Sequence, residues 1–297
     1  MPHRKIFRLQ LPTRSLVIGK RTLLMGVLNI TPDSFSDGGK FLSPDHAIAH
    51  ALSLQKAGAD LLDIGAESTR PGSAGISAVE ELRRLLPVLQ ALRGRLKIPI
   101  SIDTRKASVA EIAIGAGAEI INDVSGLNHD RRIAEVAARR RVPLILMHMR
   151  GEPRTMQKAP FARNVMKDVT QGLRASIVKA RKAGVARSQI IVDPGIGFGK
   201  SFGQNYEILR RLSELAKLGY PLLVGTSRKG FLGRTLALGK GRATGKTESV
   251  PAEERIWATA ATVTASILGG AHIVRVHDVA EMAQVVSVAD RILNPQL

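Results

Sequence analysis

Short runs of consecutive apolar residues recur along this chain of 297 residues, and longer segments of helical character separate them. A short apolar run bounded by turn residues is typical of a strand that is buried on both faces. By this criterion we predict strands at residues 23–29, 60–65, 98–103, 118–124, 142–148, 189–193, 220–226 and 271–277. We predict helices at residues 44–57, 78–93, 106–116, 130–140, 161–183, 203–217, 252–268 and 279–293.

Local residue patterns mark several of the predicted helix ends. Ser77-Ala78-Val79-Glu80 is a capping box, and Ser43-Pro44 combines an N-cap residue with proline at the first helical position. Ahead of the first buried strand, residues 5–20 predict a short β-hairpin, because two apolar segments flank a Pro-Thr-Arg-Ser turn. Glycines also stand where helices are expected to end, at Gly58, Gly117, Gly184 and Gly219.

The alternation of eight strands with eight helices predicts a (β/α)8 TIM barrel with a short N-terminal β-hairpin. A doubly wound open sheet is the alternative, although such sheets more often have about five to seven strands. No linker divides the chain, so we predict a single domain over residues 1–297. Segment 239–251, rich in Gly, Lys and Thr, interrupts one βα unit and is interpreted as a loop or an insertion.

The composition narrows the class of protein. Hydrophobic residues make up 44% of the chain and aromatic residues only 3%, so the core must consist of Val, Ile, Leu and Ala. The absence of cysteine excludes disulfides and thiolate metal sites. No apolar run reaches membrane-spanning length and no signal-peptide segment follows Met1, so we expect a soluble, cytoplasmic protein without a membrane partner.

The formal net charge of +19 has two interpretations. It suits a nucleic acid or an anionic substrate, or it reflects cations on the solvated faces of outer helices. With one Trp and two Tyr there is little aromatic surface for stacking on bases, so we expect no nucleic-acid partner. Arginine clusters inside predicted helices favour the solvated faces: Arg83-Arg84, Arg131-Arg132, Arg139–Arg141 and Arg210-Arg211.

Every predicted barrel strand ends in polar or charged residues. In a (β/α)8 barrel the carboxyl ends of the strands and the loops after them form one mouth, where the chemistry takes place. We therefore expect these groups to lie around one cavity. In strand order they are Asn29, Asp63 with the loop Glu67–Ser73, Asp103, Asn122, Met147 with His148, Asp193, Ser227–Lys229, and Arg275 with His277.

The residue types at this mouth suit a substrate that combines a heterocycle with an anionic group. Arg275 and Lys229 follow the last two strands, where barrels often bind phosphate, and Arg70 adds a further donor. Asp193 can accept two parallel N–H bonds from an aminopyrimidinone edge, and Asn122 offers both a donor and an acceptor. Lys229 also supplies a cation for a carbonyl or a ring nitrogen.

Structural roles compete with these site roles. Asp103 and Asp278 each have the alternative of capping the helix that follows. We interpret Asp63 as a buried residue bonded to loop amides, and His148 as a satisfied interior histidine. Two apolar residues suit the core as well as a ligand wall: Met147 and Phe198.

Five segments, in this order, resemble the signature motifs of the dihydropteroate synthase family: Asn29–Gly39, Asp63–Gly72, Asp193–Gly199, Ser227–Lys229 and Arg275–Asp278. The resemblance runs from about residue 22 to residue 290, and the first two segments are long and specific. It implies a cytoplasmic, usually dimeric (β/α)8 enzyme of folate biosynthesis. Such an enzyme joins 4-aminobenzoate to (7,8-dihydropterin-6-yl)methyl diphosphate and releases diphosphate with Mg²⁺.

The resemblance also implies roles for single residues. Asp103, Asn122, Asp193 and Lys229 would hold the pterin, with Met147 beneath it. The other substrate-binding residues would be Arg275, His277 and Asn29 at the diphosphate (Asn29 also at the metal), Thr69 and Arg70 on a loop over the site, Phe35, Pro71 and Phe198 at the aminobenzoate, and Ser227 of the Ser-Arg-Lys motif.

The implied mechanism assigns catalytic roles to Asp103, Asp193 and Lys229. The two carboxylates would stabilise the cation that develops on the dihydropterin, while Mg²⁺ and the cationic rim stabilise the leaving diphosphate. No strong general base is assigned, because a neutral arylamine can lose its proton after attack. Gly230 departs from the pattern, since other members carry Ser or Arg there, and its backbone N–H is the substitute contact to the aminobenzoate carboxylate.

Two other functions stay open from the sequence. A pterin-binding barrel that transfers a methyl group from a reduced folate to a corrinoid protein would share the Asp and Asn residues. It would not need the Asn29–Gly39 loop or the cationic rim. A basic RNA-binding protein would need the charge but not the polar mouth.

Overall fold

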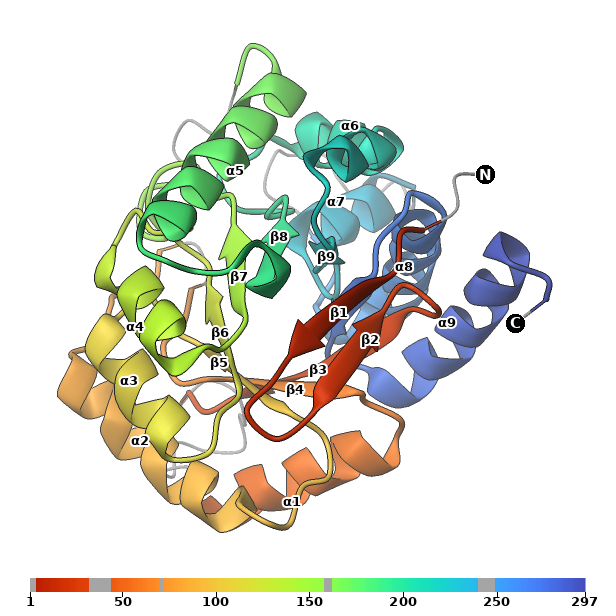
Figure 1. Ribbon diagram of the computed structural model, residues 1–297. Helices are drawn as coiled ribbons and strands as arrows, with labels where there is room; N and C mark the ends of the chain where they lie inside the picture. Colours follow the sequence, from red (N-terminus) through yellow and green to blue (C-terminus); the bar gives the residue numbers. More distant parts are fainter. Residues whose placement is uncertain (1–3, 32–43, 70–71, 158–161, 240–248, 297) are drawn as a thin grey trace.

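A closed parallel sheet forms the centre of the molecule (Figure 1). The computed structural model describes residues 4–31, 44–69, 72–157, 162–239 and 249–296. Its eight-stranded sheet has the order β8-β7-β6-β5-β4-β3-β10-β9, and a parallel bridge between Val192 and Leu222 joins the two ends of this order. The prediction of a (β/α)8 barrel is confirmed, and the open sheet is excluded.

The barrel strands lie where the apolar runs predict them. Most are shorter than the runs, because apolar residues continue into the turns on either side. The strand β9 keeps only two residues of the predicted segment 220–226. The bounds are β3 (Leu23–Asn29), β4 (Leu61–Gly65), β5 (Ile100–Asp103), β6 (Ile120–Asp123), β7 (Leu144–Met147), β8 (Ile190–Asp193), β9 (Leu223–Val224) and β10 (Ile273–Val276).

Helices surround the sheet, and their predicted boundary signals are present in the structure. The Ser77 side chain accepts a hydrogen bond from the Glu80 N–H at 3.2 Å, as an N-cap should. Gly58, Gly117, Gly184 and Gly219 all have positive φ. The bounds are α1 (Pro44–Lys56), α2 (Ala78–Leu92), α3 (Ala107–Gly115), α4 (Arg132–Arg140), α5 (Val165–Lys182), α6 (Phe202–Arg210), α7 (Gly230–Gly239), α8 (Ile256–Leu268) and α9 (Val279–Leu293).

The helix α7 is absent from the sequence-based prediction. Glycines begin and end it and a third, Gly233, lies inside, and glycine has the lowest helix propensity after proline. A Cβ at Gly233 would lie 2.4 Å from the Arg255 Nε atom, so close packing requires the glycine. Two other predicted helices also differ: residues 203–217 form α6 and a 3₁₀ helix at Leu212–Leu218, and residues 252–268 begin with a 3₁₀ turn at Glu253–Arg255.

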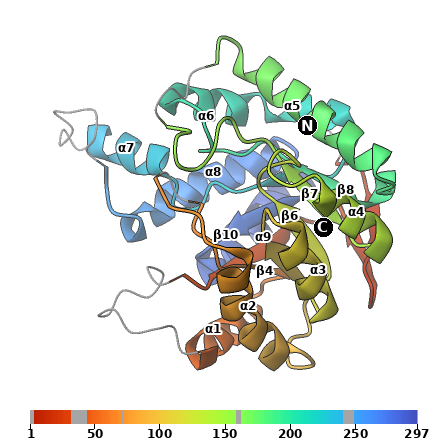
Figure 2. The ribbon, with the colours of Figure 1, turned by 90° about the vertical axis from the view of Figure 1, so that its left-hand side faces the viewer.

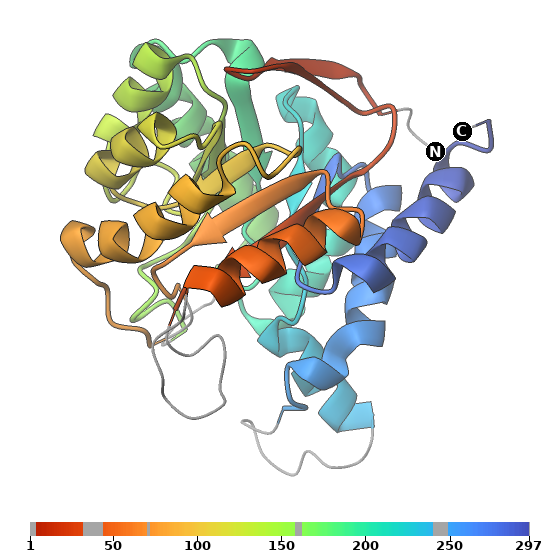
Figure 3. The ribbon, with the colours of Figure 1, turned by 90° about the horizontal axis from the view of Figure 1, so that it is seen from below.

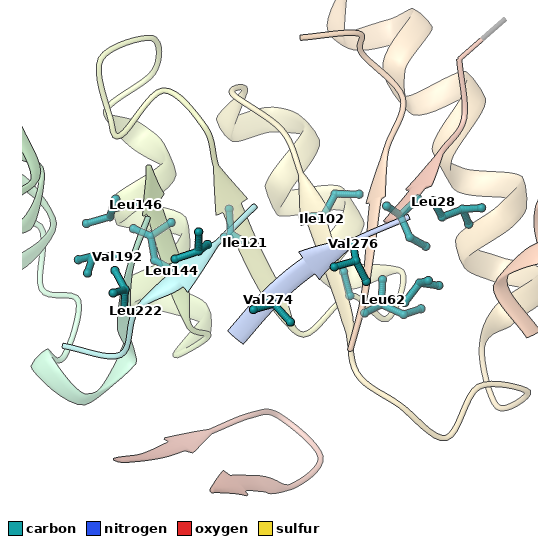
Figure 4. Close-up of a cluster of buried hydrophobic side chains, with 14 of the residues drawn as sticks. Leu28, Leu62, Ile102, Ile121, Leu144, Leu146, Val192, Leu222, Val274 and Val276 are labelled. Atoms are coloured by element: carbon teal, nitrogen blue, oxygen red, sulfur yellow. The ribbon is translucent and has the colours of Figure 1, made fainter. Parts of the chain in front are cut away.

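Each barrel strand alternates between two buried surfaces. Leu28, Leu62 and Ile102 belong to the large cluster that includes the inner faces of the helices, and Figure 4 shows its strand residues. Leu23 and Met25 belong to a second cluster inside the barrel. Because both faces are apolar, the strands appear in the sequence as continuous apolar runs rather than as alternating ones.

The predicted hairpin closes the amino-terminal end of the barrel. Its strands, β1 (Phe7–Gln10) and β2 (Ser15–Ile18), pair antiparallel, and Leu9 and Ile18 join the interior cluster with Leu23 and Met25. Figures 1 and 3 show it lying across this end, and Figure 2 shows α7 toward the opposite end. The interior is therefore accessible only from the carboxyl ends of the strands, as far as the described part of the chain goes.

A buried ion pair fixes the start of the chain to the barrel. Arg4 pairs with Asp290 of α9, and their side chains are only 4% and 8% exposed. Asp290 also accepts hydrogen bonds from the Thr22 N–H at 2.6 Å and the Thr22 hydroxyl at 2.7 Å, just before β3. Breaking a buried pair costs more than the pair contributes, because it leaves one charge unpaired.

We predict that Asp290→Ala lowers the free energy of unfolding by about 3–5 kcal/mol, because the Arg4 guanidinium loses its buried partner. Thermal unfolding followed by circular dichroism measures this as a midpoint several degrees lower. Glu214→Ala is the control, since Glu214 pairs with Arg211 on the exposed surface. Equal midpoints for the two variants would show that the ion pair at Asp290 contributes nothing.

Candidate active site

Strand alternation directs the predicted site residues into the barrel. Asn29 has the same parity as Leu23 and Met25 on β3, and Asp63 has the same parity as Leu61 on β4. The remaining strands follow the same pattern. The inward positions nearest the carboxyl ends are Asn29, Asp63, Asp103, Asn122, Met147, Asp193, Arg275 and His277.

A cavity of about 910 Å³ opens at this end of the barrel. The sequence-predicted residues that line it are Asn29, Thr69, Asp103, Phe198, Ser227, Lys229, Arg275 and His277. Asn122, Met147 and Asp193 are buried, with 3%, 3% and 6% exposure. Phe35, Arg70 and Pro71 lie outside the described residues.

A chain of hydrogen bonds links four inward side chains across the barrel. Asn122 Nδ2 donates to Asp63 Oδ2 at 3.0 Å, and Arg275 Nε donates to the same oxygen at 2.7 Å. Arg275 Nη2 donates to Asp103 Oδ2 at 3.1 Å. The Asn122 amide thus turns its nitrogen toward Asp63, which leaves its oxygen as an acceptor for a ligand.

This chain corrects our interpretation of Asp63. Its carboxylate is fully buried, but its partners are an amide and a guanidinium of the site rather than loop amides. Asp103 likewise binds Arg275 instead of capping α3, whose N-cap position is Lys106. Sequence reasoning missed the site role of Asp63 because its partners lie far away along the chain.

Lysine 229 lies against an aromatic ring near Asp193. Its ammonium is 4.0 Å from the centre of the Phe198 ring, a cation–π contact. Asp193 Oδ1 accepts a hydrogen bond from the Gly195 N–H at 2.7 Å, which fixes the carboxylate at the start of the glycine-rich turn. The arrangement fixes the buried Asp193 carboxylate near the Lys229 ammonium, which lines the cavity.

A second lysine, Lys200, stabilises this glycine-rich turn and was not predicted. Its ammonium is buried and donates to the carbonyl oxygens of His148 at 2.7 Å and Gly195 at 2.8 Å. The one available signal in the sequence was its place directly after the turn. His148 is interior, as interpreted, but not fully satisfied: its Nδ1 has no hydrogen-bond partner among the described residues.

Burial shifts the pKa values of Asp193 and Lys229 toward 7. Burial raises the pKa of Asp193 to about 6, against the opposing effects of the Gly195 N–H and Lys229. Burial, and then the positive charge of Arg275, lower the pKa of Lys229 to about 8. Burial and the neighbouring Asp63 carboxylate raise the pKa of Asp103. Such shifts are typical of active sites.

The cationic side of the cavity suits an anion. Ser227 Oγ and His277 Nδ1 lie 3.0 Å apart, and the backbone N–H of His277 donates to the same hydroxyl at 3.2 Å. Burial and the charges of Arg275 and Arg228 lower the pKa of His277 to about 3, so its ring is neutral at pH 7. Asp278 binds the Arg228 guanidinium and makes no side-chain cap at α9. Arg275, Lys229, Ser227 and His277 line the cavity, where they can bind an anionic ligand.

Comparisons with known proteins identify the family. The family model described as pterin binding enzyme matches residues 25–277. The chain is 50% identical to a dihydropteroate synthase from Synechocystis over 92% of this chain and 90% of that protein. It is 46% identical to the Bacillus subtilis dihydropteroate synthase over 93% of this chain and 90% of that protein. This chain belongs to the dihydropteroate synthase family of pterin-binding enzymes.

Solved dihydropteroate synthases have the same fold. The Yersinia pestis enzyme with a bound sulfonamide superposes with a TM-score of 0.88 at 39% identity, covering 97% of this chain and 99% of that one. The Xanthomonas albilineans enzyme with 4-aminobenzoic acid superposes with a TM-score of 0.86 at 39% identity, covering 98% and 99%. In the part of our chain that the structure describes, no helix is long and apolar enough to cross a membrane.

We predict that Lys229→Ala folds normally and loses most dihydropteroate synthase activity. The ammonium lines the cavity, and losing one preorganised electrostatic group costs roughly a hundred- to a thousandfold in rate. Steady-state turnover with both substrates measures the loss, and circular dichroism checks the fold. A folded variant with near-normal turnover would exclude Lys229 from the site.

We predict that Asp193→Asn loses affinity for the pterin far more than it loses stability. An amide presents one acceptor and one NH₂ group where the heterocycle needs two acceptors, so a donor meets a donor. Calorimetric titration with the pterin diphosphate measures the affinity, and the thermal midpoint measures the stability. Unchanged affinity would mean that the Asp193 carboxylate only caps the Gly195 turn.

Proposed function

We propose that this chain condenses 4-aminobenzoate with (7,8-dihydropterin-6-yl)methyl diphosphate and releases 7,8-dihydropteroate and diphosphate. It is a transferase of folate synthesis, the activity of its curated relatives. One observation carries the proposal: a cavity lined by Asp103, Lys229 and Arg275 lies beside the buried Asp63 and Asn122, and Arg275 is hydrogen-bonded to Asp63. The Xanthomonas albilineans enzyme, with the same fold, has been solved with 4-aminobenzoic acid and with 7,8-dihydropteroate.

The pterin is held by the carboxylates and the amide. Asp193 accepts the N–H groups of the aminopyrimidinone edge, and Asn122 presents the oxygen that Asp63 leaves free. Lys229 donates to the ring from the Phe198 side. Asp103 supplies a further carboxylate at the cavity wall, where Arg275 keeps it oriented.

The diphosphate is held by Arg275, His277 and Ser227, which line the same cavity. We propose Mg²⁺ as the cofactor, with Asn29 as a protein ligand. Asn29 lines the cavity beside Arg275 and His277, and Mg²⁺ commonly binds together with substrate phosphates. When bound, the ion stabilises negative charge on the leaving group.

The reaction begins with loss of diphosphate from the methylene carbon. The bond from carbon to oxygen breaks because the electron-rich dihydropterin delocalises the positive charge, and Asp103 and Asp193 stabilise that charge. The neutral arylamine then attacks the methylene carbon and loses its proton afterwards. The protein holds the reactants and stabilises charge, and no residue has to act as a strong base.

The quaternary structure and the location follow from the family resemblance. We propose a homodimer in the cytoplasm that binds small-molecule substrates. Sedimentation equilibrium tests the dimer, because a mass near one chain at micromolar concentration would contradict it. No nucleic-acid partner is proposed, and the exposed arginines of α2 and α4 support this, since Arg83, Arg139 and Arg140 pair with glutamates on the helix surfaces.

Diphosphate release tests the function. The purified protein is incubated with the pterin diphosphate, 4-aminobenzoate and Mg²⁺, and both products are quantified. Equal amounts of diphosphate and dihydropteroate are expected. No dihydropteroate is expected when 4-aminobenzoate is omitted. A protein that forms no dihydropteroate but transfers a methyl group from a reduced folate would contradict the proposal.

We predict a bell-shaped pH dependence of kcat/KM for the pterin diphosphate. It falls from about pH 7 to below pH 6, where Asp103 and then Asp193 are protonated in the free enzyme and lose their negative charge. It also falls above about pH 8, where Lys229 loses its positive charge. Lys229→Arg should lose the alkaline limb, because a guanidinium does not titrate in this range. An alkaline limb that persists in this variant would assign it to another group.

A further inference from the structure

The turn that carries Ser227 and Lys229 has a strained backbone. Arg228, between them, has φ of +58°, in the left-handed region that residues with a Cβ rarely adopt. Non-glycine residues in this region cost free energy and persist only where the surrounding contacts hold them. Arg228, both its neighbours and Arg255 line the cavity, so whatever holds this conformation also positions Ser227 and Lys229 there.

Arg255 holds the main chain of this turn from a distant segment. Its Nη1 donates to the Arg228 carbonyl oxygen at 2.7 Å, across 27 residues of sequence. The Arg228 N–H donates to Thr259 Oγ1 at 3.2 Å, and its guanidinium binds Asp278. The left-handed residue is thus held at its carbonyl, its N–H and its side chain.

The other nitrogens of Arg255 bind the segment just before it. Nε donates to the Val250 carbonyl oxygen at 2.7 Å, and Nη2 donates to Ser249 Oγ at 3.2 Å. The Val250 N–H in turn donates to the Gly233 carbonyl oxygen of α7 at 3.1 Å. All three guanidinium nitrogens therefore have partners in the protein, and the planar group joins the turn, the end of segment 239–251 and α7.

We propose that Arg255 is a positioning residue for the reaction. By holding Arg228 in its left-handed conformation, it places the Lys229 ammonium over Phe198 and the Ser227 hydroxyl beside His277. The inference rests on the proposed condensation of the pterin diphosphate with 4-aminobenzoate. It gives the described end of segment 239–251 a function, because Ser249 and Val250 hold the guanidinium in place.

The first test compares two arginine variants. Arg255→Met should lower kcat/KM for the pterin diphosphate roughly a hundredfold, the effect expected when reacting groups are misplaced by about 1 Å. Arg187→Met is the matched control, because Arg187 also donates to the carbonyl of a left-handed residue, Gly219, at 3.1 Å, ahead of β8 and away from the cavity. The control should keep wild-type turnover, and equal effects in the two variants would overturn the proposal.

The decisive test removes the strain that Arg255 is proposed to hold. Glycine adopts a left-handed φ at no steric cost, so the turn in Arg228→Gly depends less on Arg255 for its conformation. Arg255→Met should then cost less than about tenfold in the Arg228→Gly background, against roughly a hundredfold in the wild-type background. An equal loss in both backgrounds would show that Arg255 acts in another way, for instance on the ligand, and the proposal would be wrong.

Hydrogen exchange separates this inference from the proposed function. The Lys229 N–H donates to the Thr226 carbonyl oxygen and the Leu232 N–H to the Lys229 carbonyl oxygen. In Arg255→Met these amides should exchange at least tenfold faster, while amides of β5 stay unchanged. Unchanged exchange would overturn the inference even if the enzyme is active, whereas a wild-type protein that makes no dihydropteroate would overturn only the function.

Arg255→Lys keeps these tests open if Arg255→Met does not fold. A lysine retains the charge but cannot make three hydrogen bonds in the guanidinium plane. Arg255→Lys should therefore speed exchange and lower kcat/KM as Arg255→Met does, but by smaller factors. Its effect on kcat/KM should be smaller still in the Arg228→Gly background. A lysine variant that matches the wild-type enzyme in both measurements would contradict the role of the three guanidinium hydrogen bonds.

Discussion

The pairing of Asp63 with Arg275 inside the barrel is the interaction on which the site depends. A fully buried carboxylate and a guanidinium meet at 2.7 Å, and through them the strands β4, β5, β6 and β10 share one hydrogen-bonded chain. Burying such charges is costly, and the cost is offset only when several good hydrogen bonds satisfy them. The chain satisfies one oxygen of Asp63, which accepts from both Asn122 and Arg275, while its Oδ1 has no partner among the described residues. It leaves Asn122 and Asp103 oriented toward a ligand before one arrives.

The remaining electrostatics follow from the same enclosure. The hairpin fills the amino-terminal end of the barrel, and the polar groups are buried at or beside the cavity at the other end. Burial raises the pKa of Asp193 and lowers that of Lys229. Both groups still carry their charges near pH 7, where a carboxylate for the heterocycle and a cation for the same ligand are needed together.

The strand ends and the turn after β9 position their side chains in different ways. Strand ends supply rigid groups, while the turn after β9 needs support because Arg228 occupies a strained conformation. Arg255, just after segment 239–251, supplies that support at the Arg228 carbonyl, together with Thr259 and Asp278. Some of the outer arginines, such as Arg139 and Arg211, pair with glutamates on the helix surfaces.

The sequence by itself determined the barrel, the hairpin and the order of the polar strand ends, because apolar runs and turn glycines are local signals. It also placed Asp103, Lys229 and Arg275 at one mouth, since a closed parallel barrel brings all carboxyl ends together. Only the tertiary structure decided the partners of Asp63, the helix α7 and the role of Arg255. Those features depend on contacts between residues far apart in the chain and on burial, which no local pattern records.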